Sequence, residues 1–512
     1  MASRRDELNA YTFAKRRLVG QFLQPNPTGT EEGAPKPLRG VVPGMIVAVV
    51  VLAVFGAIGI FKPKAPGDWD AAEQNIIRAG GSSSFYVVLK TNGKPQLHEV
   101  LNLASARLLL APGADIVDVD EDILDKSDLP RGATLGIQNA PDRLPSADEV
   151  GRKKRWAVCQ RPTDSGRAVQ KAAFVLDDRE AGRLGGKEKL AGGDVLYVQG
   201  PDDQRYLVDA TGTKYPFRGA GETLESLLRP IVGAGTKPQR VSYEWLKTLH
   251  PGDEIYFPDV EGLSQPADVD ADGLEADRRR VGMVLSANSG ADEDFFVVLR
   301  DRIAPVSDFM ADLLLNNPAA AQSLGQDGKP VQVSTGAIAP SDEPFGGTLK
   351  WPTAEANPVN EASTQPGSRN SICNVLSDVA GGNRAVLFTW AGTRFPAQLA
   401  IGSASVYVTP GTGQLYRQSS GTSTDTGSFF LVTDKGLRYA LQSNEDGQED
   451  ACGLGTADAA RKKGETAGEQ NSAQKRLNYE GVEAAPVPEE WSDFLPTGPR
   501  LSTADACQPQ NQ

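Results

Sequence analysis

The chain has 512 residues, with 66 Asp and Glu against 53 Lys and Arg, which gives a formal net charge of −13 at pH 7. This acidic balance argues against a nucleic-acid-binding protein, because such proteins present a basic face to phosphates. Hydrophobic residues make up 39% of the chain and charged residues 23%, which is enough for packed cores. The part beyond residue 61, about 450 residues, exceeds one usual core and predicts several modules.

The first predicted element is an N-terminal helix. Ser3 and Asp6 have the spacing of a capping box, and a long stretch without Pro or Gly follows. Apolar side chains recur near one face, and basic residues lie beside them, so we expect contacts with anionic lipid headgroups or with a partner. A helix that only anchors the topology is the alternative. The candidate partner-binding residues are Arg4, Arg5, Leu8, Tyr11, Phe13, Arg16 and Arg17.

An apolar run at 41–61 follows a connector at 24–40 that holds four Pro and three Gly. The run contains no charged residue, and as a helix it would extend about 30 Å, the thickness of a bilayer's hydrocarbon core. A buried core helix is usually amphipathic, and a cleaved signal peptide ends at small residues. We therefore predict one transmembrane helix.

The charge distribution predicts the orientation of this helix. Residues 1–40 carry a net charge of +3, and everything after residue 40 carries −16. Because basic residues stay on the cytosolic side, we expect a cytosolic N-terminus and an extracytoplasmic remainder in the plasma membrane. The four cysteines fall in that remainder, and their even number suggests disulfides in an oxidising space, with free buried thiols as the alternative. Three pairings are open among Cys159, Cys373, Cys452 and Cys507.

Four aromatic, β-branched segments beyond the run lead into a polar turn and a second short strand, which is a hairpin signature. They begin at Phe85, Tyr206, Phe295 and Phe429. Apolar helical stretches follow three of them, at 97–110, 223–228 and 306–315. We interpret these segments as four diverged α+β repeats, and chance recurrence of strands in a β-rich protein is the alternative. The predicted repeats are 62–130, 195–260, 280–325 and 420–500.

A second pattern occurs in two of the repeats. After both Trp245 and Trp491, a Leu follows at four residues and a Gly at seven. This spacing predicts that Trp and Leu share one helix face and that the Gly ends the helix. A weaker echo without the Trp is present at Leu109, Pro112 and Gly113.

Two β-rich stretches, 131–194 and 335–418, lie between the repeats, and each holds one cysteine. A central domain assembled from both and crosslinked by Cys159 and Cys373 would explain this placement. Such a link closes a loop of more than 200 residues and would stabilise the fold by about 4–5 kcal/mol in the entropic account.

The last repeat is bracketed by Cys452 and Cys507, which could pair with each other. Residues 444–469 are rich in Gly and charged side chains and are expected to form a mobile insertion in this repeat. Residues 501–512 form a polar tail, which we expect to fray unless Cys507 holds it.

Few residues point to catalysis. The two histidines are His98 and His250, and His250 is expected to cap a helix in a Leu-His-Pro-Gly sequence. The sequence has no G-x-S-x-G elbow, no H-E-x-x-H pair and no G-x-x-x-x-G-K-[ST] phosphate loop. We therefore expect no catalytic residue and no cofactor.

One acidic segment partly matches a calcium loop. Asp268, Asp270 and Asp272 have the D-x-D-x-D spacing, and a glycine follows them. Arg279 stands at the twelfth position, where a bidentate Glu is required, and its charge would repel the ion. These aspartates are weak metal candidates, and an acidic solvated loop is the preferred interpretation.

The N-terminal sequence SRRDELNAYTFAKRR at 3–17 resembles the N-terminus of EccB, the single-span membrane component of actinobacterial type VII (ESX-type) secretion systems. The Pro-Leu-Arg before the apolar run and the Trp491-x-x-x-Leu495-Pro496 sequence are also similar to that family. The resemblance implies an α+β fold, with one transmembrane helix and four repeat domains around a central β-rich domain. It also implies a conserved disulfide at Cys159 and Cys373, with Cys452 and Cys507 additional.

The same resemblance implies partners. The cytosolic helix and the span would pack with the EccC motor ATPase and with EccD and EccE, and the exported region would self-associate and meet the mycosin protease. Such assemblies export small helical WXG100 substrates. An ATPase activity is attributed to the family, so ATP is a cofactor by that attribution only.

The leading hypothesis is a structural membrane component that scaffolds the extracytoplasmic side of a type VII secretion complex. A membrane-anchored extracytoplasmic nucleotide hydrolase and a cell-wall-binding protein are the alternatives.

Overall fold

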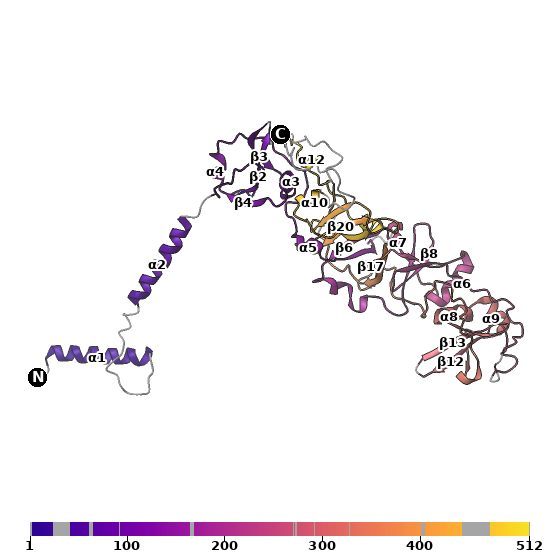
Figure 1. Cartoon of the computed structure of the whole chain (residues 1–512). Coiled ribbons are helices and arrows are strands. Elements are labelled where there is room, and N and C mark those ends of the chain that lie inside the picture. The colour runs from indigo at the N-terminus through magenta and orange to yellow at the C-terminus, as the bar shows by residue number, and fades with distance from the viewer. Residues whose placement is uncertain are drawn as a thin grey trace.

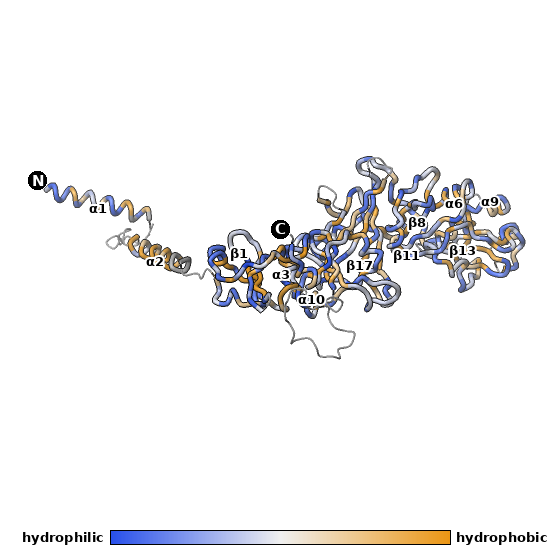
Figure 2. The backbone as a smooth tube through the Cα atoms, turned by 90° about the horizontal axis from the view of Figure 1, so that it is seen from above, coloured by the Kyte–Doolittle hydropathy of each residue, from blue (hydrophilic) through white to orange (hydrophobic). Residues whose placement is uncertain are grey.

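Figure 1 shows the chain as a computed structural model. The structure describes residues 3–23, 41–60, 65–91, 93–163, 168–269, 271, 274–290, 292–326, 328–400, 405–442 and 472–510. Beyond residue 65 these residues form an elongated body, and both views place α3 (Leu103–Leu109) near the C-terminus at one end and β13 (Asp292–Val298) at the other (Figures 1 and 2).

The N-terminal part contains two helices of 20 residues, α1 (Arg4–Leu23) and α2 (Val41–Ile60). The predicted cap of α1 is present in part, because the Asp6 carboxylate accepts a hydrogen bond from the Ser3 backbone N–H at 3.2 Å. Side chains of α2 are described only as far as Phe55. Across the described residues, no helix reaches the length and apolarity needed to cross a membrane.

Four of the five sheets share one strand order. In each, three consecutive antiparallel strands are followed, after a crossover, by a strand that pairs in parallel with the first of the three. The first sheet contains β1 (Asn75–Ala79), β2 (Phe85–Thr91), β3 (Lys94–Val100) and β4 (Asp115–Val119), and the second contains β7 (Asp194–Gln199), β8 (Arg205–Asp209), β9 (Thr213–Pro216), β10 (Gln239–Arg240), β11 (His250–Pro251) and β16 (Asn357–Pro358). The third contains β12 (Val284–Ser289), β13, β14 (Ile303–Val306) and β15 (Val331–Val333), and the fourth contains β20 (Gly413–Ser419), β21 (Phe429–Thr433), β22 (Arg438–Leu441) and β23 (Ala485–Pro488).

The four predicted hairpins are confirmed as β2–β3, β8–β9, β13–β14 and β21–β22. In the first, Thr91 pairs with Lys94, and Gly93, directly before Lys94, has a φ of +75° that favours glycine. The first strand of the fourth sheet, β20, lies before the boundary expected at 420, and β15 lies after the boundary expected at 325.

Helices fill the crossovers between the third and the parallel strand. They are α3 in the first sheet, α6 (Gly221–Val232) in the second, α8 (Asp308–Leu315) and α9 (Pro318–Leu324) in the third, and α10 (Ser472–Arg476) in the fourth. The expectation of a helix over 97–110 is wrong at its start, because residues 97–100 belong to β3. Asn102 ends that strand locally by capping α3, with its side chain accepting from the Ser105 N–H at 2.9 Å. The remaining short helices are α4 (Glu121–Asp125), α5 (Ala147–Gly151), η3 (Ala181–Leu184), η4 (Gly186–Glu188), α7 (Tyr243–Lys247), η5 (Thr335–Ala337), α11 (Glu489–Ser492) and α12 (Thr503–Ala506).

The fifth sheet is built from two distant segments. Its strands are β5 (Arg155–Pro162), β6 (Val169–Leu176), β17 (Ser371–Ala380), β18 (Arg384–Gly392) and β19 (Val406–Val408), in the order β18-β17-β5-β6-β19. The antiparallel pairing of β5 with β17 joins the hairpin β5–β6 to the hairpin β17–β18. We call it the central sheet.

Three apolar clusters connect the sheets into one body. One cluster joins the helix-covered faces of the first and fourth sheets, and another joins those of the second and third. The third brings one face of the central sheet against the second and fourth sheets. Each pair of neighbours along the elongated body therefore shares a buried core, which opposes bending at the junctions.

Candidate functional site

Cys159 and Cys373 form a disulfide at the middle of the central sheet. They lie directly opposite each other in β5 and β17, and both side chains are fully buried. The bond covalently closes the sheet that holds the two chain segments together, across a sequence separation of 214 residues. We take this disulfide and the contacts around it as the candidate functional site, because the central sheet holds the second and fourth sheets, on which the third and first sheets pack.

The second sheet docks on the central sheet through hydrogen bonds to buried backbone groups. The Trp245 Nε1–H donates to the carbonyl oxygen of Val158 at 3.0 Å, and the Asn374 amide donates to the carbonyl oxygen of Thr248 at 2.7 Å. Trp245 is fully buried. Each of these hydrogen bonds requires one relative position of donor and acceptor, so the contacts define a specific geometry as well as an apolar interface.

The fourth sheet docks through aromatic side chains. The Trp156 Nε1–H donates to Gln414 Oε1 at 2.8 Å, and the ring of Trp156 meets Tyr416 edge-on with centroids 5.2 Å apart. Tyr416 stacks on Phe430 at 5.5 Å, and burial raises the pKa of Tyr416 to about 12. Its hydroxyl hydrogen-bonds the hydroxyl of Ser492 at 2.8 Å, which satisfies the polar end of the ring.

A buried ionic cluster lies at the start of the central sheet. The Lys154 Nζ donates to Asp177 Oδ2 at 2.7 Å and to Glu149 Oε1 at 3.1 Å, and the side chain of Lys154 is 0% exposed. Burial by itself would raise the pKa of Asp177, but hydrogen bonds from Lys154 and Arg179 hold it well below its usual range. No sequence pattern identifies this cluster, because the four basic residues at 152–155 look alike in the sequence and nothing marks Lys154 as the buried one.

The expected helix in the Trp-Leu-Gly pattern is shorter than predicted. Helix α7 ends at Lys247, before Leu249, and His250 lies in the short strand β11 with its Nε2 2.9 Å from the carbonyl oxygen of Ala385. The expected C-cap role of His250 is therefore wrong. The Gly does not end the helix either, because Gly252 lies beside the third strand of the sheet.

The role of this glycine is close packing against an aromatic ring. A Cβ on Gly252 would lie 2.4 Å from the ring of Tyr215, and a Cβ on Gly498 would lie 2.7 Å from that of Tyr439. In the first sheet the equivalent glycine is Gly132, whose Cβ would collide with His98. The expected echo at Leu109, Pro112 and Gly113 is therefore wrong. The signal that identifies the position is a Leu-x-x-Gly sequence with a Pro between the Leu and the Gly, which occurs in these three sheets at 129–132, 249–252 and 495–498.

The third sheet has a serine where the other three sheets have this glycine. At the corresponding position the Ser341 N–H donates to the carbonyl oxygen of Ile303, as the Gly252 N–H does to that of Lys214. The next residue of the third strand is Ala304, which is small, so no glycine is required opposite it.

The predicted partner-binding residues lie on α1, and the side chains of Leu8, Tyr11 and Phe13 are between 63% and 68% exposed. The basic members, Arg4, Arg5, Arg16 and Arg17, lie on the same helix. Apolar side chains that are this exposed are typical of a helix that acquires a partner or a lipid surface.

The remaining predicted residues divide between described and undescribed parts of the chain. Asp268 is exposed, and Asp270 and Asp272 lie outside the described residues. Among the residues that are described, no group of three His, Cys, Asp or Glu could hold a metal ion. Cys507 is buried and disulfide-bonded, and its predicted partner Cys452 lies outside the described residues, as does the expected insertion at 444–469.

The C-terminal tail is held in place as far as Gln510, which agrees with the expected exception in which Cys507 holds it, because Cys507 is buried and disulfide-bonded. The backbone N–H of Gln510 donates to the carbonyl oxygen of Thr134 at 2.9 Å, and its side-chain amide donates to that of Gly136 at 2.6 Å. The end of the described chain therefore adds to the edge of the first sheet, where Pro509 bridges Leu135.

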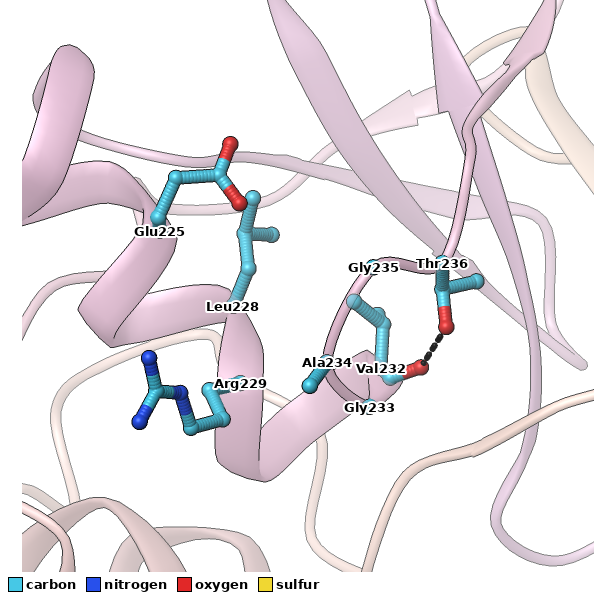
Figure 3. Close-up of a pocket in the computed structure, with 8 residues that line it drawn as sticks. All are labelled: Glu225, Leu228, Arg229, Val232, Gly233, Ala234, Gly235 and Thr236. Atoms are coloured by element: carbon cyan, nitrogen blue, oxygen red, sulfur yellow. Dashed lines mark hydrogen bonds between the residues drawn. The ribbon is translucent and has the colours of Figure 1, made fainter.

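Two hollows in the surface can be compared in volume with a small-molecule site. One, of about 60 Å³, lies at the C-terminal end of α6, which contains Pro230, and there the Thr236 hydroxyl donates to the carbonyl oxygen of Val232 at 2.6 Å (Figure 3). The other, of about 650 Å³, is open and lies between residues 136–138 and the C-terminal segment. The first is far smaller than the 300–1,000 Å³ typical of a small-molecule site, and the second is lined by an Arg500–Asp505 ion pair and by glutamines.

Comparison with known proteins gives a consistent result. The family model "Type VII secretion system ESX-1, transport TM domain B" (EccB) matches residues 1–512. The ESX-3 secretion system ATPase EccB3 of Mycolicibacterium smegmatis is 26% identical, covering 98% of this chain and 90% of that protein. The ESX-2 secretion system ATPase EccB2 of Mycobacterium tuberculosis is 25% identical, covering 86% of this chain and 87% of that protein.

Solved structures show the same fold. A chain of an intact ESX-5 inner membrane complex is similar with a TM-score of 0.58 and 19% identity, covering 100% of this chain and 96% of that chain. A chain of an EccB3 dimer from the ESX-3 core complex is similar with a TM-score of 0.56 and 22% identity, covering 85% and 99%. Since the family model extends over the whole sequence, the chain belongs to the EccB family of type VII secretion system components.

Proposed function

We propose that this chain is a structural subunit that scaffolds the extracytoplasmic side of a type VII secretion complex. The observation that carries the proposal is the unbroken packing of five sheets, in which each neighbouring pair shares a buried core and the central pair is crosslinked by Cys159–Cys373. A body of this kind keeps distant surfaces at set positions, which is what a scaffold requires. The four sheets of common strand order would then be diverged repeats around the central domain.

The proposed topology is a single crossing at 41–61, with the N-terminus in the cytosol. It is supported by the absence of charge in this run and by the basic excess before it. A β-lactamase or phosphatase reporter fused after residue 512 should be active outside the cell. An active reporter inside the cell would overturn the topology, and the oxidised cysteines with it.

The proposed partners follow from the resemblance and from the exposed face of α1. Affinity purification of the full-length chain from native membranes should recover EccC and EccD, with EccE and a mycosin protease as further expected companions. Replacing Leu8 and Tyr11 by Asp should reduce the recovery of EccC at least several-fold, because both side chains are exposed and apolar. Asn9→Ala on the same helix is the matched control, and unchanged recovery with the Asp variant would contradict the role of α1.

The relatives' names also contain the word ATPase, so nucleotide hydrolysis is the second candidate. The sequence contains no phosphate loop, and we propose that ATP turnover in such complexes belongs to the motor subunit. The purified full-length chain should release no more phosphate from Mg-ATP than the same sample in EDTA. Turnover that persists through purification to homogeneity would favour the enzyme instead.

Binding to cell-wall polymers is the third candidate, and a pull-down with insoluble wall material separates it from scaffolding. We expect the full-length chain to stay in the supernatant.

A further inference from the structure

The parallel strands of the four related sheets differ in how far they could pair with another chain. β10 has only two residues and β15 only three. β23 contains Pro486 and Pro488, which lack the N–H that a further strand would need. Short strands and prolines at the edge of a sheet discourage pairing with another chain, so these three strands are poor places for an added strand.

β4 has neither kind of protection. It contains five residues and no proline, and it stands at the end of the strand order β3-β2-β1-β4. The opposite edge of the first sheet is covered, because β3 is bridged by Arg131 and Leu135, and Leu135 is bridged in turn by Pro509. Within the described part of the chain, no strand or bridge pairs with the outer side of β4. We call the outer side of β4 the open edge.

The backbone hydrogen bonds show which groups of β4 point outward. The N–H and C=O of one strand residue point to the same side, and successive residues alternate between the two neighbours. The carbonyl oxygen of Val119 accepts from the Gly80 N–H at 3.0 Å on the β1 side, so every second residue of β4 bonds to β1. Ile116 and Asp118 therefore direct their N–H and C=O groups away from the sheet. The Ile116 residue is 39% exposed and the Asp118 side chain 65% exposed, so a partner can reach these groups.

Carboxylates surround the open edge. Residues 111–130, which include β4 and α4, contain seven Asp and Glu against one Lys, and all seven acids are exposed. Asp118 pairs with Arg78 on β1 at 2.6 Å, whereas Asp115 and the acids of α4 border the other face of the strand. Like charges placed opposite each other destabilise paired strands, so two copies of this edge would repel each other. A strand with basic side chains would be attracted instead.

We propose that the open edge accepts an added strand from a different protein, as an extended segment in which Lys or Arg alternates with apolar residues. The apolar side chains would extend the face of Ile116, which lies beside the core residue Ile76 of β1. The basic side chains would lie on the other face, toward Asp115 and the acids of α4. Main-chain hydrogen bonds supply affinity in such strand addition, and alternate side chains supply specificity. The inference rests on the proposed scaffold function and adds the class of segment that this surface binds.

Synthetic peptides test the open edge on the full-length chain in detergent. The probe is a peptide of about ten residues in which Lys and Val alternate. One control is the same peptide with methylated backbone nitrogens, which cannot donate hydrogen bonds, and the other replaces each Lys by Glu. We expect saturable binding of the probe at low salt and roughly tenfold weaker binding of both controls. Equal binding of the methylated peptide, or no binding of the probe, would overturn the proposal.

Variants of the chain locate the binding. Ile116→Pro removes an outward N–H without removing a hydrogen bond to β1, and it should weaken binding of the probe roughly tenfold. Ile116→Val keeps the N–H and is the matched control. Asp115→Asn combined with Asp122→Asn should weaken binding at low salt and have little effect at high salt, where charges are screened. Thermal unfolding checks that each variant folds, and unchanged binding by the folded variants would refute the open edge as the site.

A photo-crosslinking residue in place of Asp122 identifies the occupant in native membranes. We expect a crosslink to a segment of another protein in which Lys or Arg stands next to apolar residues, and we expect Ile116→Pro to abolish it. A crosslink to another copy of this chain, or one that Ile116→Pro leaves unchanged, would contradict the proposal. Recovery of secretion components without an edge-dependent crosslink would refute this inference alone, whereas failure to recover any such component would count against the scaffold function.

Discussion

The second and fourth sheets pack the faces opposite their crossover helices on the central sheet, together with the short helices α7 and α11. The first and third sheets cover the same face with their own polypeptide. The difference is visible at one equivalent position of the second strand. Val208 and Val432 lie in the core shared with the central sheet. In contrast, Val88 packs with Ala65, Trp69 and Ala72, and Val298 packs with Ala267, Val269, Ala271 and Leu274. Modules with the same strand order therefore have two uses. In the inner modules this face packs on the central sheet, and in the outer modules it is covered by the module's own chain.

The largest test of this comparison removes the crosslink beneath the inner modules. Replacing Cys159 and Cys373 together by Ser should lower the free energy of unfolding by about 4–5 kcal/mol in the entropic account. Denaturant unfolding followed by hydrogen exchange should show the loss first in the central, second and fourth sheets. A uniform loss that includes the third sheet to the same extent would contradict the division into inner and outer modules.

Replacing a tryptophan in the core shared with the central sheet should destabilise the chain more than replacing one in an outer module. Trp245→Ala or Trp491→Ala removes a fully buried ring and should cost about 3–5 kcal/mol of unfolding free energy. Trp69→Ala, which changes a partly exposed ring over the outer face of the first sheet, is the matched comparison and should cost less than about 2 kcal/mol. Equal costs in chemical denaturation would mean that the inner faces are no more tightly packed than the outer ones.

The glycine–aromatic contact gives a smaller and more local effect. Gly252→Ala should destabilise by about 1–3 kcal/mol, because the new Cβ would overlap the Tyr215 ring. Gly182→Ala is a suitable control, since nothing lies within 4 Å of its new Cβ. The urea midpoints of unfolding of both variants and of the unmodified chain check this prediction. An unchanged midpoint for Gly252→Ala would show that the ring moves aside freely.

A change of pH should have opposite effects on the stability contributed by two carboxyl groups, one in an outer module and one in the inner part of the body. Burial, with Glu355 nearby, raises the pKa of Asp312 in α8 to about 6. The folded state then binds more protons than the unfolded state between about pH 4 and pH 6, so this group's contribution to stability falls as the pH rises through that window. Asp312→Asn should remove this dependence and stabilise the chain by no more than about 2 kcal/mol at pH 7.

Asp177 beneath the central sheet has the opposite sign. Its pKa is held below the usual range by Lys154 and Arg179, so its stabilising contribution is present at neutral pH and is lost as the pH falls below about 4. Thermal unfolding of the chain and of Asp312→Asn from pH 3 to pH 8 separates the two. A variant whose profile matches that of the unmodified chain between pH 4 and pH 7 would contradict the assignment for Asp312.

The sequence by itself determined the elements whose signals are local. The four hairpins could be predicted because the second and third strands of each sheet are adjacent in the chain and joined by short turns, and α1 and α2 follow from unbroken helical stretches. Cys159 and Cys373 could be named because the family resemblance supplied the pair, and their placement in separate β-rich stretches agreed with it.

Only the tertiary structure decided the rest. The parallel strands β4, β10, β15 and β23 pair across crossovers, and no local pattern marks such pairing. The spacing of the glycine after Trp in the Trp-Leu-Gly pattern suggests a helix end. Its actual role depends on the Tyr215 ring, which lies in another strand. The buried Lys154 and the raised pKa of Asp312 likewise depend on neighbours distant in sequence, since burial and charge act through space rather than along the chain.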